Sequence, residues 1–343
     1  MGQSFYTNVL QYGNFLLVRE VKNGERNLNK RVKYSPTLFA PVRKETPYKT
    51  LDGKYVTDIK FDTIKEAKEH VEAYKSQPGL VYGNTQHAYS YIADQYKGRV
   101  EFDIDQLMMA TIDIEVKSEN GFPSPTEAKE ELLSITIKNH QSKKIVVWGI
   151  GDFTTERKDV TYIKCETEVH LLKEFIVFWE RHYPDIITGW NTEFFDIPYI
   201  CNRIVSLFGE DELKRLSPWG SVREREVYQL GRRQQAYDIA GIASLDFMAL
   251  YRKFTYTAQE SYALNHIATV ELGEQKDGNP YETFSEWYQK DWQSFIEYNI
   301  QDVEIVDKLE DKMRLVELCL TMAYDAKVNY TDGLGSVKYW DIL

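Results

Sequence analysis

In this 343-residue chain the most informative stretch is Thr111-Ile112-Asp113-Ile114-Glu115-Val116, which combines an apolar pattern with two acids. Its apolar, alternating pattern predicts a buried strand. Because residues two apart on a strand point to the same face, Asp113 and Glu115 should project side by side. Two neighbouring carboxylates repel each other and lose hydration when buried, so a protein core would not hold them for stability alone. A divalent cation bound by both is the simplest compensation, and the stretch therefore predicts a metal site.

Two later stretches place further acids on elements that could converge on this strand. Trp190-Asn191-Thr192-Glu193-Phe194-Phe195-Asp196 puts an acid where a strand passes into a helix. Tyr298-Asn299-Ile300-Gln301-Asp302 puts a phenol and an acid four residues apart, on one face of a helix. Each piece alone has an ordinary explanation: a solvated strand edge, a helix N-cap at Asp196, or a surface pair. The ordered set of four acids and one phenol is far more specific than any of its members.

Composition and charge limit the possible functions. The chain is 43% hydrophobic and 28% charged, which predicts an ordered globular protein with room for two domains. Its net charge of −11 argues against electrostatic wrapping of duplex DNA, although acids that hold metals would add to that charge in a nucleic-acid enzyme. The three dispersed cysteines are expected to be reduced core residues of a cytoplasmic protein. The sequence shows neither a signal-peptide pattern nor an apolar run of about 18 residues, so no membrane association is expected.

The pattern of elements changes near residue 105. Residues 1–105 predict a small mixed α+β domain with one clear helix over 63–76, and residues 327–343 are expected to rejoin it. Over residues 106–326 strands are followed by helices, which predicts an α/β domain with a mixed sheet flanked by helices; a strand is expected over 242–248. Residues 222–240 predict a charged hairpin whose arginines could meet a phosphate backbone, although a solvated hairpin is the simpler explanation.

These stretches together resemble the proofreading half of a family B DNA polymerase of the T-even bacteriophage type. Further matching stretches follow in order over essentially the whole chain: Asn120-Gly121-Phe122-Pro123, Arg215-Leu216-Ser217-Pro218, Ser244-Leu245-Asp246 and Leu272-Gly273-Glu274-Gln275-Lys276. The resemblance implies an exonuclease of the DEDD class, in its tyrosine subtype, on a ribonuclease-H-like fold. Such an enzyme removes 3′-terminal nucleotides with two divalent metal ions, usually Mg²⁺ or Mn²⁺.

The same resemblance assigns roles to individual residues. The implied metal ligands are Asp113, Glu115, Asp196 and Asp302. Tyr298 would orient the attacking water, since a pKa of about 10 makes a phenol a poor base at neutral pH. Lys276 would offset charge near the scissile phosphate, although a surface lysine would be the simpler explanation without the motif around it. Phe122, Asn191 and Phe195 would contact the terminal nucleotides, with a core role as the alternative for Phe195.

The polymerase motifs of the family do not follow, because Tyr330-Thr331-Asp332-Gly333 is only a faint echo of one of them. The resemblance therefore implies a chain that works with a separate or deleted polymerase (palm) portion and does not polymerise alone. Its implied substrate is a single-stranded or frayed 3′ end of primer–template DNA, in the host cytoplasm if the chain is phage-encoded. Two alternatives stay open. One is a non-catalytic nucleic-acid-binding or docking module, which could include RNA binding. The other is a ribonuclease, which shares the acids but not the extra domain.

Overall fold

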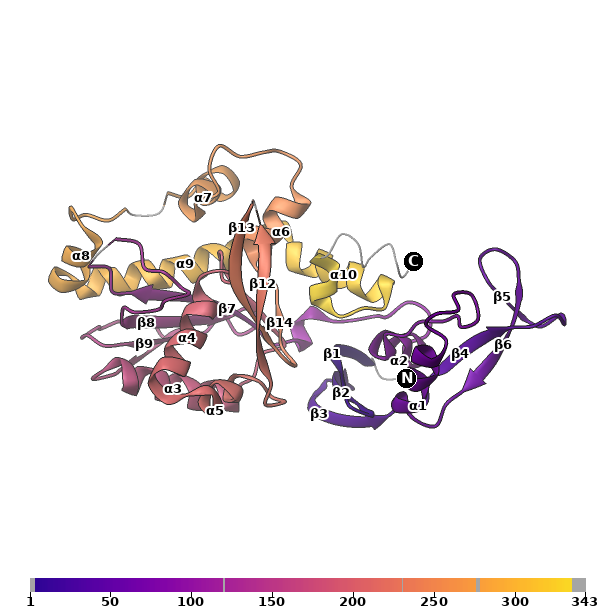
Figure 1. The fold of residues 1–343 in the computed structure, drawn as a ribbon. Coiled ribbons are helices and arrows are strands. Elements are labelled where there is room, and N and C mark those ends of the chain that lie inside the picture. Colours follow the sequence, from indigo (N-terminus) through magenta and orange to yellow (C-terminus); the bar gives the residue numbers. More distant parts are fainter. Residues whose placement is uncertain (1–3, 120, 230, 276–277, 335–343) are drawn as a thin grey trace. The chain divides into compact units, whose positions relative to one another are not determined.

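The chain in this computed structural model divides into two compact units. One unit comprises Met1–Phe102 and Ala323–Leu343, and the other comprises Asp103–Met322, so the second unit is inserted between two parts of the first. Figure 1 follows the chain by colour through both units. The structure describes residues 4–119, 121–229, 231–275 and 278–334.

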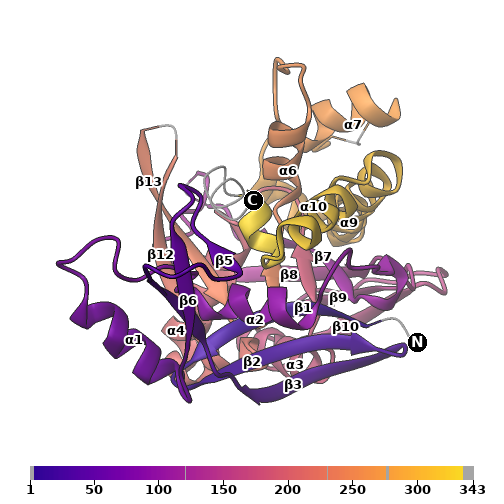
Figure 2. The same ribbon diagram turned by 90° about the vertical axis from the view of Figure 1, so that its right-hand side faces the viewer.

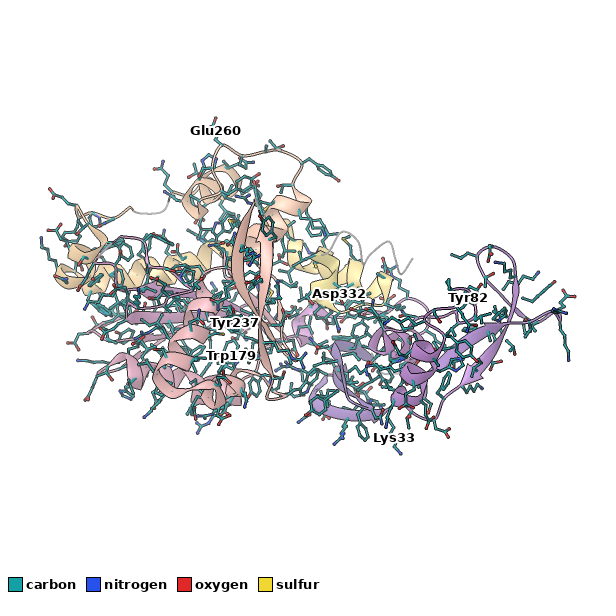
Figure 3. All side chains as sticks on the ribbon, in the orientation of Figure 1. Lys33, Tyr82, Trp179, Tyr237, Glu260 and Asp332 are labelled. Carbon is teal, nitrogen blue, oxygen red and sulfur yellow. The ribbon has the colours of Figure 1, made fainter. Side chains whose placement is uncertain are left out.

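The first unit is built from small antiparallel sheets and short helices. Its strands are β1 (Ser4–Tyr12), β2 (Phe15–Lys22), β3 (Glu25–Lys33), β4 (Thr37–Pro41), β5 (Tyr48–Lys49) and β6 (Tyr55–Lys60), and its helices are α1 (Ile64–Ala73) and α2 (His87–Gln95). β2 lies between β1 and β3 in one sheet, and β6 lies between β4 and β5 in another. Helix α1 begins where the Thr63 hydroxyl accepts a hydrogen bond from the N–H of Glu66, at 3.2 Å. Lys33, at the end of β3, points outward and is exposed (Figure 3).

Buried tyrosines join the first strand of this unit to the segment that returns to it late in the chain. The hydroxyl of Tyr6 donates to the carbonyl oxygen of Val328 at 2.6 Å. The carbonyl oxygen of Tyr6 in turn accepts hydrogen bonds from the hydroxyls of Tyr324 and Tyr330, at 2.8 and 2.9 Å. All of these side chains are buried, so each hydroxyl needs its partner to avoid a desolvation cost. The unit is therefore completed by residues that follow the second unit in sequence.

The second unit is built around a mixed sheet. Its strands are β7 (Met109–Val116), β8 (Leu132–Asn139), β9 (Ile145–Gly149), β10 (Val160–Lys164), β11 (Ile186–Thr188), β12 (Val222–Gln229), β13 (Arg232–Ile239) and β14 (Ala243–Ser244). Its helices are α3 (Glu168–Arg181), α4 (Asp196–Phe208), α5 (Glu210–Leu213), α6 (Phe247–Phe254), α7 (Leu264–Leu272), α8 (Phe284–Lys290) and α9 (Trp292–Met313), and α10 (Leu315–Ala326) leads back to the first unit. The strand order is β10-β9-β8-β7-β11-β14. β8 runs antiparallel to both of its neighbours, and the other neighbouring pairs are parallel. β12 and β13 form a separate antiparallel hairpin.

Helices cover both faces of this sheet. On one face, α3 and α4 pack with Ile112 and Ile114 of β7, as the alternating pattern of that strand predicts. Trp179 of α3 and Tyr237 of β13 belong to the same apolar layer (Figure 3). On the other face, α8 and α9 pack against β8 and β9. Figures 1 and 2 show α9 and α3 on opposite sides of the sheet. The expected α/β class, with a central mixed sheet flanked by helices, is confirmed.

A buried ion pair fixes α3 to α4. The Nε atom of Arg203 lies 2.6 Å from a carboxylate oxygen of Glu168, and each residue is less than a tenth exposed. Arg203 also donates to the carbonyl oxygen of Ala128 at 3.0 Å, while Glu168 accepts a hydrogen bond from the N–H of Leu132 at 3.0 Å. These additional bonds satisfy charges that would otherwise be costly to bury. The pair therefore holds α3, α4 and the start of β8 together beside the strand that carries Asp113.

The prediction of a strand over residues 242–248 is wrong beyond its first half. β14 is limited to Ala243–Ser244, and α6 begins at Phe247. The carboxylate of Asp246 accepts a hydrogen bond from the N–H of Ala249 at 3.0 Å, which is an N-cap contact. The second half of this apolar run follows the period of a helix and not that of a strand. Among the described residues, no helix is both long enough and apolar enough to cross a membrane.

Candidate active site

Three acids from two elements of the second unit meet at the face of the sheet that α9 covers. Asp113 and Glu115 lie on β7 and Asp302 lies on α9, and each offers a carboxylate oxygen within 4.8 Å of the others. Glu115 and Asp302 are less than a tenth exposed, and Asp113 is half-buried. Negative charges held this closely with little water repel one another strongly. Such an arrangement is stabilised by positive charge in the same place or by protonation of an acid.

Asp196 occupies the first turn of α4, where Phe195 is the N-cap residue. Its side chain accepts a hydrogen bond from the N–H of Ile114 in β7, at 3.0 Å. Burial, together with the nearby charges of Asp246 and Asp302, raises the pKa of Asp196 to about 8. Its ionised form is therefore disfavoured unless a cation lies nearby.

Tyr298 stands one helical turn before Asp302 on α9, and its ring meets that of Trp287 edge to face with centroids 4.8 Å apart. Burial raises the pKa of its hydroxyl far above 10, and the neighbouring carboxylates of Asp302, Glu115 and Asp113 raise it further. The phenol is therefore neutral at physiological pH, a form that can donate and accept hydrogen bonds.

A cleft of about 640 Å³ joins these groups to solvent. Its lining includes the four acids and the phenol: Asp113, Glu115, Asp196, Asp302 and Tyr298. Phe122, Phe195 and Asn191 line the same cleft. Phe122 is 84% exposed, and its ring lies against that of Phe195 with centroids 5.1 Å apart. A large exposed aromatic beside an acidic cleft suits stacking on a flat, apolar group of a ligand.

The loop between β11 and α4 carries Asn191, leads into Asp196 and passes close to β7. A Cβ atom on Gly189 would lie 2.5 Å from the carbonyl oxygen of Ile112 and would also meet Thr192, so glycine is needed for this close approach. Asn191 has a φ of +66°, a left-handed conformation that asparagine tolerates better than most residues. Glycine and asparagine at positions 189 and 191, between a strand and a helix, are the residue types that suit this close approach and this left-handed backbone.

Two further buried residues, Asp246 and Asn299, hold parts of the site in place through hydrogen bonds. Asp246 accepts a hydrogen bond from the N–H of Glu193 at 3.0 Å, and thereby holds the loop that precedes Asp196; burial raises its pKa to about 6. Asn299 donates from its side-chain amide to Asp113 Oδ2, at 2.5 Å. Asn299 could have been found from its spacing, because it stands three residues before Asp302 and faces the same side of α9.

The donor set suits a hard divalent cation. Carboxylate oxygens are the ligands that Mg²⁺ and Mn²⁺ prefer. Another cluster with similar spacing, formed by His140, Asp307 and Asp311, provides a contrast. There the ammonium groups of Lys138 and Lys143 lie 3.1 and 2.9 Å from the carboxylate of Asp307, so lysines already compensate its charge. We therefore assign the candidate metal centre to the acids of β7, α4 and α9, and not to this ion-pair network.

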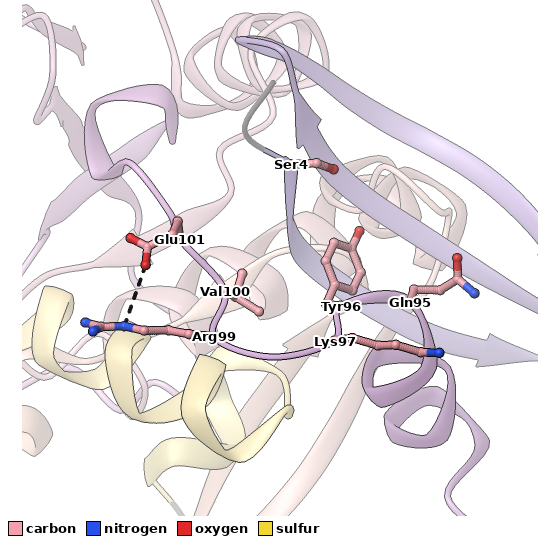
Figure 4. Close-up of a pocket in the computed structure, with 7 residues that line it drawn as sticks. All are labelled: Ser4, Gln95, Tyr96, Lys97, Arg99, Val100 and Glu101. Carbon is pink, nitrogen blue, oxygen red and sulfur yellow. Dashed lines mark ion pairs between the residues drawn. The ribbon is translucent and has the colours of Figure 1, made fainter. Parts of the chain in front are cut away.

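Lys276, for which the family resemblance implies a role near the scissile phosphate, lies outside the described residues. A separate hollow of about 560 Å³ lies in the first unit (Figure 4). It is lined by Lys97 and Arg99, and Arg99 Nε is 3.8 Å from a carboxylate oxygen of Glu101. Glu101 is the one carboxylate among its lining residues, all of which belong to the described part of the chain, and it is already paired. This hollow therefore lacks the convergent acids of the cleft in the second unit.

Comparison with known proteins identifies the class. Residues 62–267 match the family described as DNA polymerase family B, exonuclease domain. Because the match covers more than half of the chain, the chain belongs to this family. The matched range contains Asp113, Glu115 and Asp196, and it ends before α9, which carries Tyr298 and Asp302.

Similar whole proteins are viral DNA polymerases. The DNA-directed DNA polymerase of Escherichia phage RB69 is 31% identical over an alignment that covers 99% of this chain and 41% of that protein. The DNA-directed DNA polymerase of Enterobacteria phage T4 is 29% identical, over 99% of this chain and 40% of that protein. The DNA polymerase catalytic subunit of Psittacid herpesvirus 1 is 24% identical, over 52% of this chain and 18% of that protein. The chain thus spans about two fifths of the length of the phage relatives.

Proposed function

We propose that this chain is the 3′–5′ proofreading exonuclease portion of a family B DNA polymerase, and that it removes nucleotides from single-stranded or frayed DNA 3′ ends. The observation that carries the proposal is the meeting of Asp113, Glu115 and Asp302 in one cleft with Asp196 and Tyr298. The family match and the mixed sheet with helices on both faces also support it, together with a ribonuclease-H-like fold.

In this proposal the acids hold two divalent metal ions, Mg²⁺ or Mn²⁺. When bound, such ions supply Lewis acidity to the attacking and leaving oxygens of an in-line phosphodiester hydrolysis. Asp113, Glu115 and Asp302 would hold one ion, and Asp113 with Asp196 would hold the other. The N–H of Ile114 fixes the side chain of Asp196, which lines the same cleft as Asp113.

The remaining residues position the substrate. Tyr298 offers a neutral hydroxyl that orients the attacking water, since its raised pKa excludes a phenolate at neutral pH. The rings of Phe122 and Phe195 would stack on the terminal bases, and the Asn191 side chain would hydrogen-bond the last nucleotide. Lys276 would offset charge at the scissile phosphate.

The proposal includes a partner. The phage relatives are DNA-directed DNA polymerases more than twice as long as this chain, which supports a separate or deleted polymerase portion that supplies the palm. The chain would act on primer–template DNA bound by that portion, in the cytoplasm, which would be that of the host cell if the chain is phage-encoded. The exonuclease domain would comprise residues 106–326, and residues 1–105 with 327–343 would form the N-terminal domain.

A single-strand degradation assay tests the proposal. A DNA oligonucleotide labelled at its 5′ end should be shortened stepwise from its 3′ end when Mg²⁺ is added, and EDTA should stop the reaction. Asp113→Ala should abolish shortening. Asp311→Ala is the matched control, because Asp311 is a half-exposed acid near the end of α9, and its variant should retain wild-type activity. Equal degradation by wild type and Asp113→Ala, or none by the wild type with Mg²⁺ or Mn²⁺, would exclude the proposed function.

A further inference from the structure

We propose that Asn299 is a positioning residue that fixes the carboxylate of Asp113 for metal binding, and that the hydroxyls of Ser134 and Thr136 fix Asn299 in turn. This inference rests on the proposed function, because it concerns the same acids. Asn299 is fully buried on α9, and its Nδ2 atom donates to Asp113 Oδ2 at 2.5 Å. It is therefore a direct contact of the strand that carries the acids.

The register of the sheet explains why the two hydroxyls meet Asn299. In the pairing of β7 with β8, Thr136 lies opposite Asp113 and Ser134 lies opposite Glu115. Residues directly opposite each other in an antiparallel pair project from the same face, so both hydroxyls stand beside the acids and under α9. Ser134 Oγ donates to Asn299 Oδ1 at 3.0 Å, and Thr136 Oγ1 donates to the same oxygen.

These contacts determine which way the amide of Asn299 faces. With the amide reversed, its carbonyl oxygen would lie against the carboxylate oxygen of Asp113 at hydrogen-bonding distance, and two acceptors would repel each other. In the observed orientation, two hydroxyls hold the carbonyl oxygen and the amide N–H meets the carboxylate. The hydrogen bonds therefore run in one direction: Ser134 and Thr136 donate to Asn299, and Asn299 donates to Asp113.

The chemical consequence concerns the direction of the Asp113 carboxylate. A carboxylate rotates easily about its last bond, and ordering it when a cation binds carries an entropic cost. The bond from Asn299 sets this rotation in advance, because Asn299 is itself held by β8. Groups that orient metal ligands in this way typically change metal affinity or activity by about 10–100-fold when they are removed. The alternative is a core asparagine that only joins α9 to β8.

Asn299→Leu separates these readings, because leucine fills a similar volume and cannot donate to Asp113. Mn²⁺ binding is measured by calorimetry on the whole chain without DNA, and melting temperature is measured without metal. We expect Mn²⁺ affinity to fall about 10–100-fold, and cleavage at a fixed low Mn²⁺ concentration to fall with it. Asn202→Leu is the control: Asn202 on α4 donates to Gln235 Oε1 and to the carbonyl oxygen of Pro125, away from the acids. It should lower the melting temperature without changing Mn²⁺ affinity.

Removing the two hydroxyls in a second variant keeps the inference testable should Asn299→Leu fail to fold. Ser134→Ala combined with Thr136→Val leaves Asn299 in place but frees its amide, so Mn²⁺ affinity should again fall, by about tenfold. Wild-type Mn²⁺ affinity in whichever of the two variants is folded would overturn the inference. That result differs from failure of the proposed function, in which the wild-type chain itself would neither bind Mn²⁺ nor degrade DNA.

Discussion

Arg225 of the β12–β13 hairpin and Glu193 of the loop before α4 form an ion pair with an N–O distance of 2.5 Å. Arg225 also bonds to Asp238 on the opposite strand of the hairpin, at 2.7 Å. The hairpin is thereby attached to the loop that carries Asn191 and leads into Asp196. Because both Arg225 and Glu193 are partly exposed, the pair contributes only about 0.2–1 kcal/mol to stability. The structural effect of the ion pair is to restrict the position of the hairpin relative to this loop.

Arg225→Ala should therefore loosen the hairpin without unfolding the chain. We expect a melting temperature close to that of the wild type and faster amide hydrogen exchange in β12 and in residues 190–195. Arg233→Ala is a suitable control, since Arg233 is 75% exposed on its side chain and pairs with Glu226 within the hairpin at 3.6 Å. Unchanged exchange in residues 190–195 of the Arg225 variant would contradict the link.

Asp302→Asn should make the metal-free chain more stable and the metal-loaded chain less active. The substitution removes one of three crowded negative charges, so the melting temperature in EDTA should rise. The wild type should gain about 2.7 kcal/mol when the metal concentration is 100 times the dissociation constant, and the variant should gain less. Cleavage should fall by at least about 100-fold. Thermal unfolding with and without Mn²⁺ measures both effects, and a lower melting temperature of the variant in EDTA would argue against repulsion among the acids.

Tyr298→Phe should slow cleavage without changing its pH dependence. The phenylalanine ring keeps the contact with Trp287 and removes only the hydroxyl, which orients the attacking water in the proposed function. Loss of one hydrogen bond in such a site corresponds to a rate decrease of roughly 10–100-fold. Since burial raises the pKa of Tyr298 above 10, the hydroxyl stays protonated from pH 6 to about 9 and loses no proton as pH rises. Single-turnover rates of wild type and variant should therefore run parallel over that range, and an inflection that appears only in the wild type would mean that the phenol ionises.

Arg203→Ala should be among the most destabilising substitutions outside the cleft. It leaves the buried carboxylate of Glu168 without its partner, for a cost of about 3–5 kcal/mol in the free energy of unfolding. Arg215→Ala provides the comparison, because Arg215 pairs with Glu180 at 2.6 Å while both side chains are about one-third exposed. That change should cost only about 0.2–1 kcal/mol. Urea unfolding of the two variants measures the difference, and similar losses would show that burial does not govern these pairs.

Gly189→Ala should displace the loop that carries Asn191 and Asp196. Its new methyl group would meet the carbonyl oxygen of Ile112 at 2.5 Å, and relieving that overlap should cost about 1–3 kcal/mol and most of the activity. Gly209→Ala tests the backbone conformation separately, since Gly209 has a φ of +88° but no atom near its would-be Cβ. It should lose about 1 kcal/mol of stability and retain activity. Equal activity of the two variants would exclude a role for the close approach.

The sequence predicted the elements of the site better than the bonds within it. The alternation in residues 111–116 was enough to predict a strand with Asp113 and Glu115 on one face, because that pattern depends only on local geometry. The meeting of this strand with Asp302 depends on packing between residues nearly 190 positions apart, and it was inferred from a family resemblance rather than from spacing. The contact of Asp196 with the N–H of Ile114 was not foreseen, because an acid in the first turn of a helix suggests an N-cap.

Asn299 and Asp246 show where sequence reasoning ends. A buried amide or carboxylate is identified by the partners that satisfy it, and these partners lie on β8 and in the loop before α4. The strand predicted over residues 242–248 failed for a related reason. The N-cap bond of Asp246 begins a helix within an apolar run that fits either period, so only the tertiary contact decides between them.

The hydrogen bonds of Tyr324 and Tyr330 to Tyr6 also determine the order in which the two units can be completed during translation. Ribosomes add about 5–20 residues per second, so β1 waits roughly 15–65 s before Tyr324 and Tyr330 are synthesised. The unit that is translated first is therefore completed last, after the whole of the second unit has been synthesised. During that interval the hydroxyl and the carbonyl oxygen of Tyr6 lack the partners that they have in the folded protein, and a chain released before residue 324 would leave them without those partners.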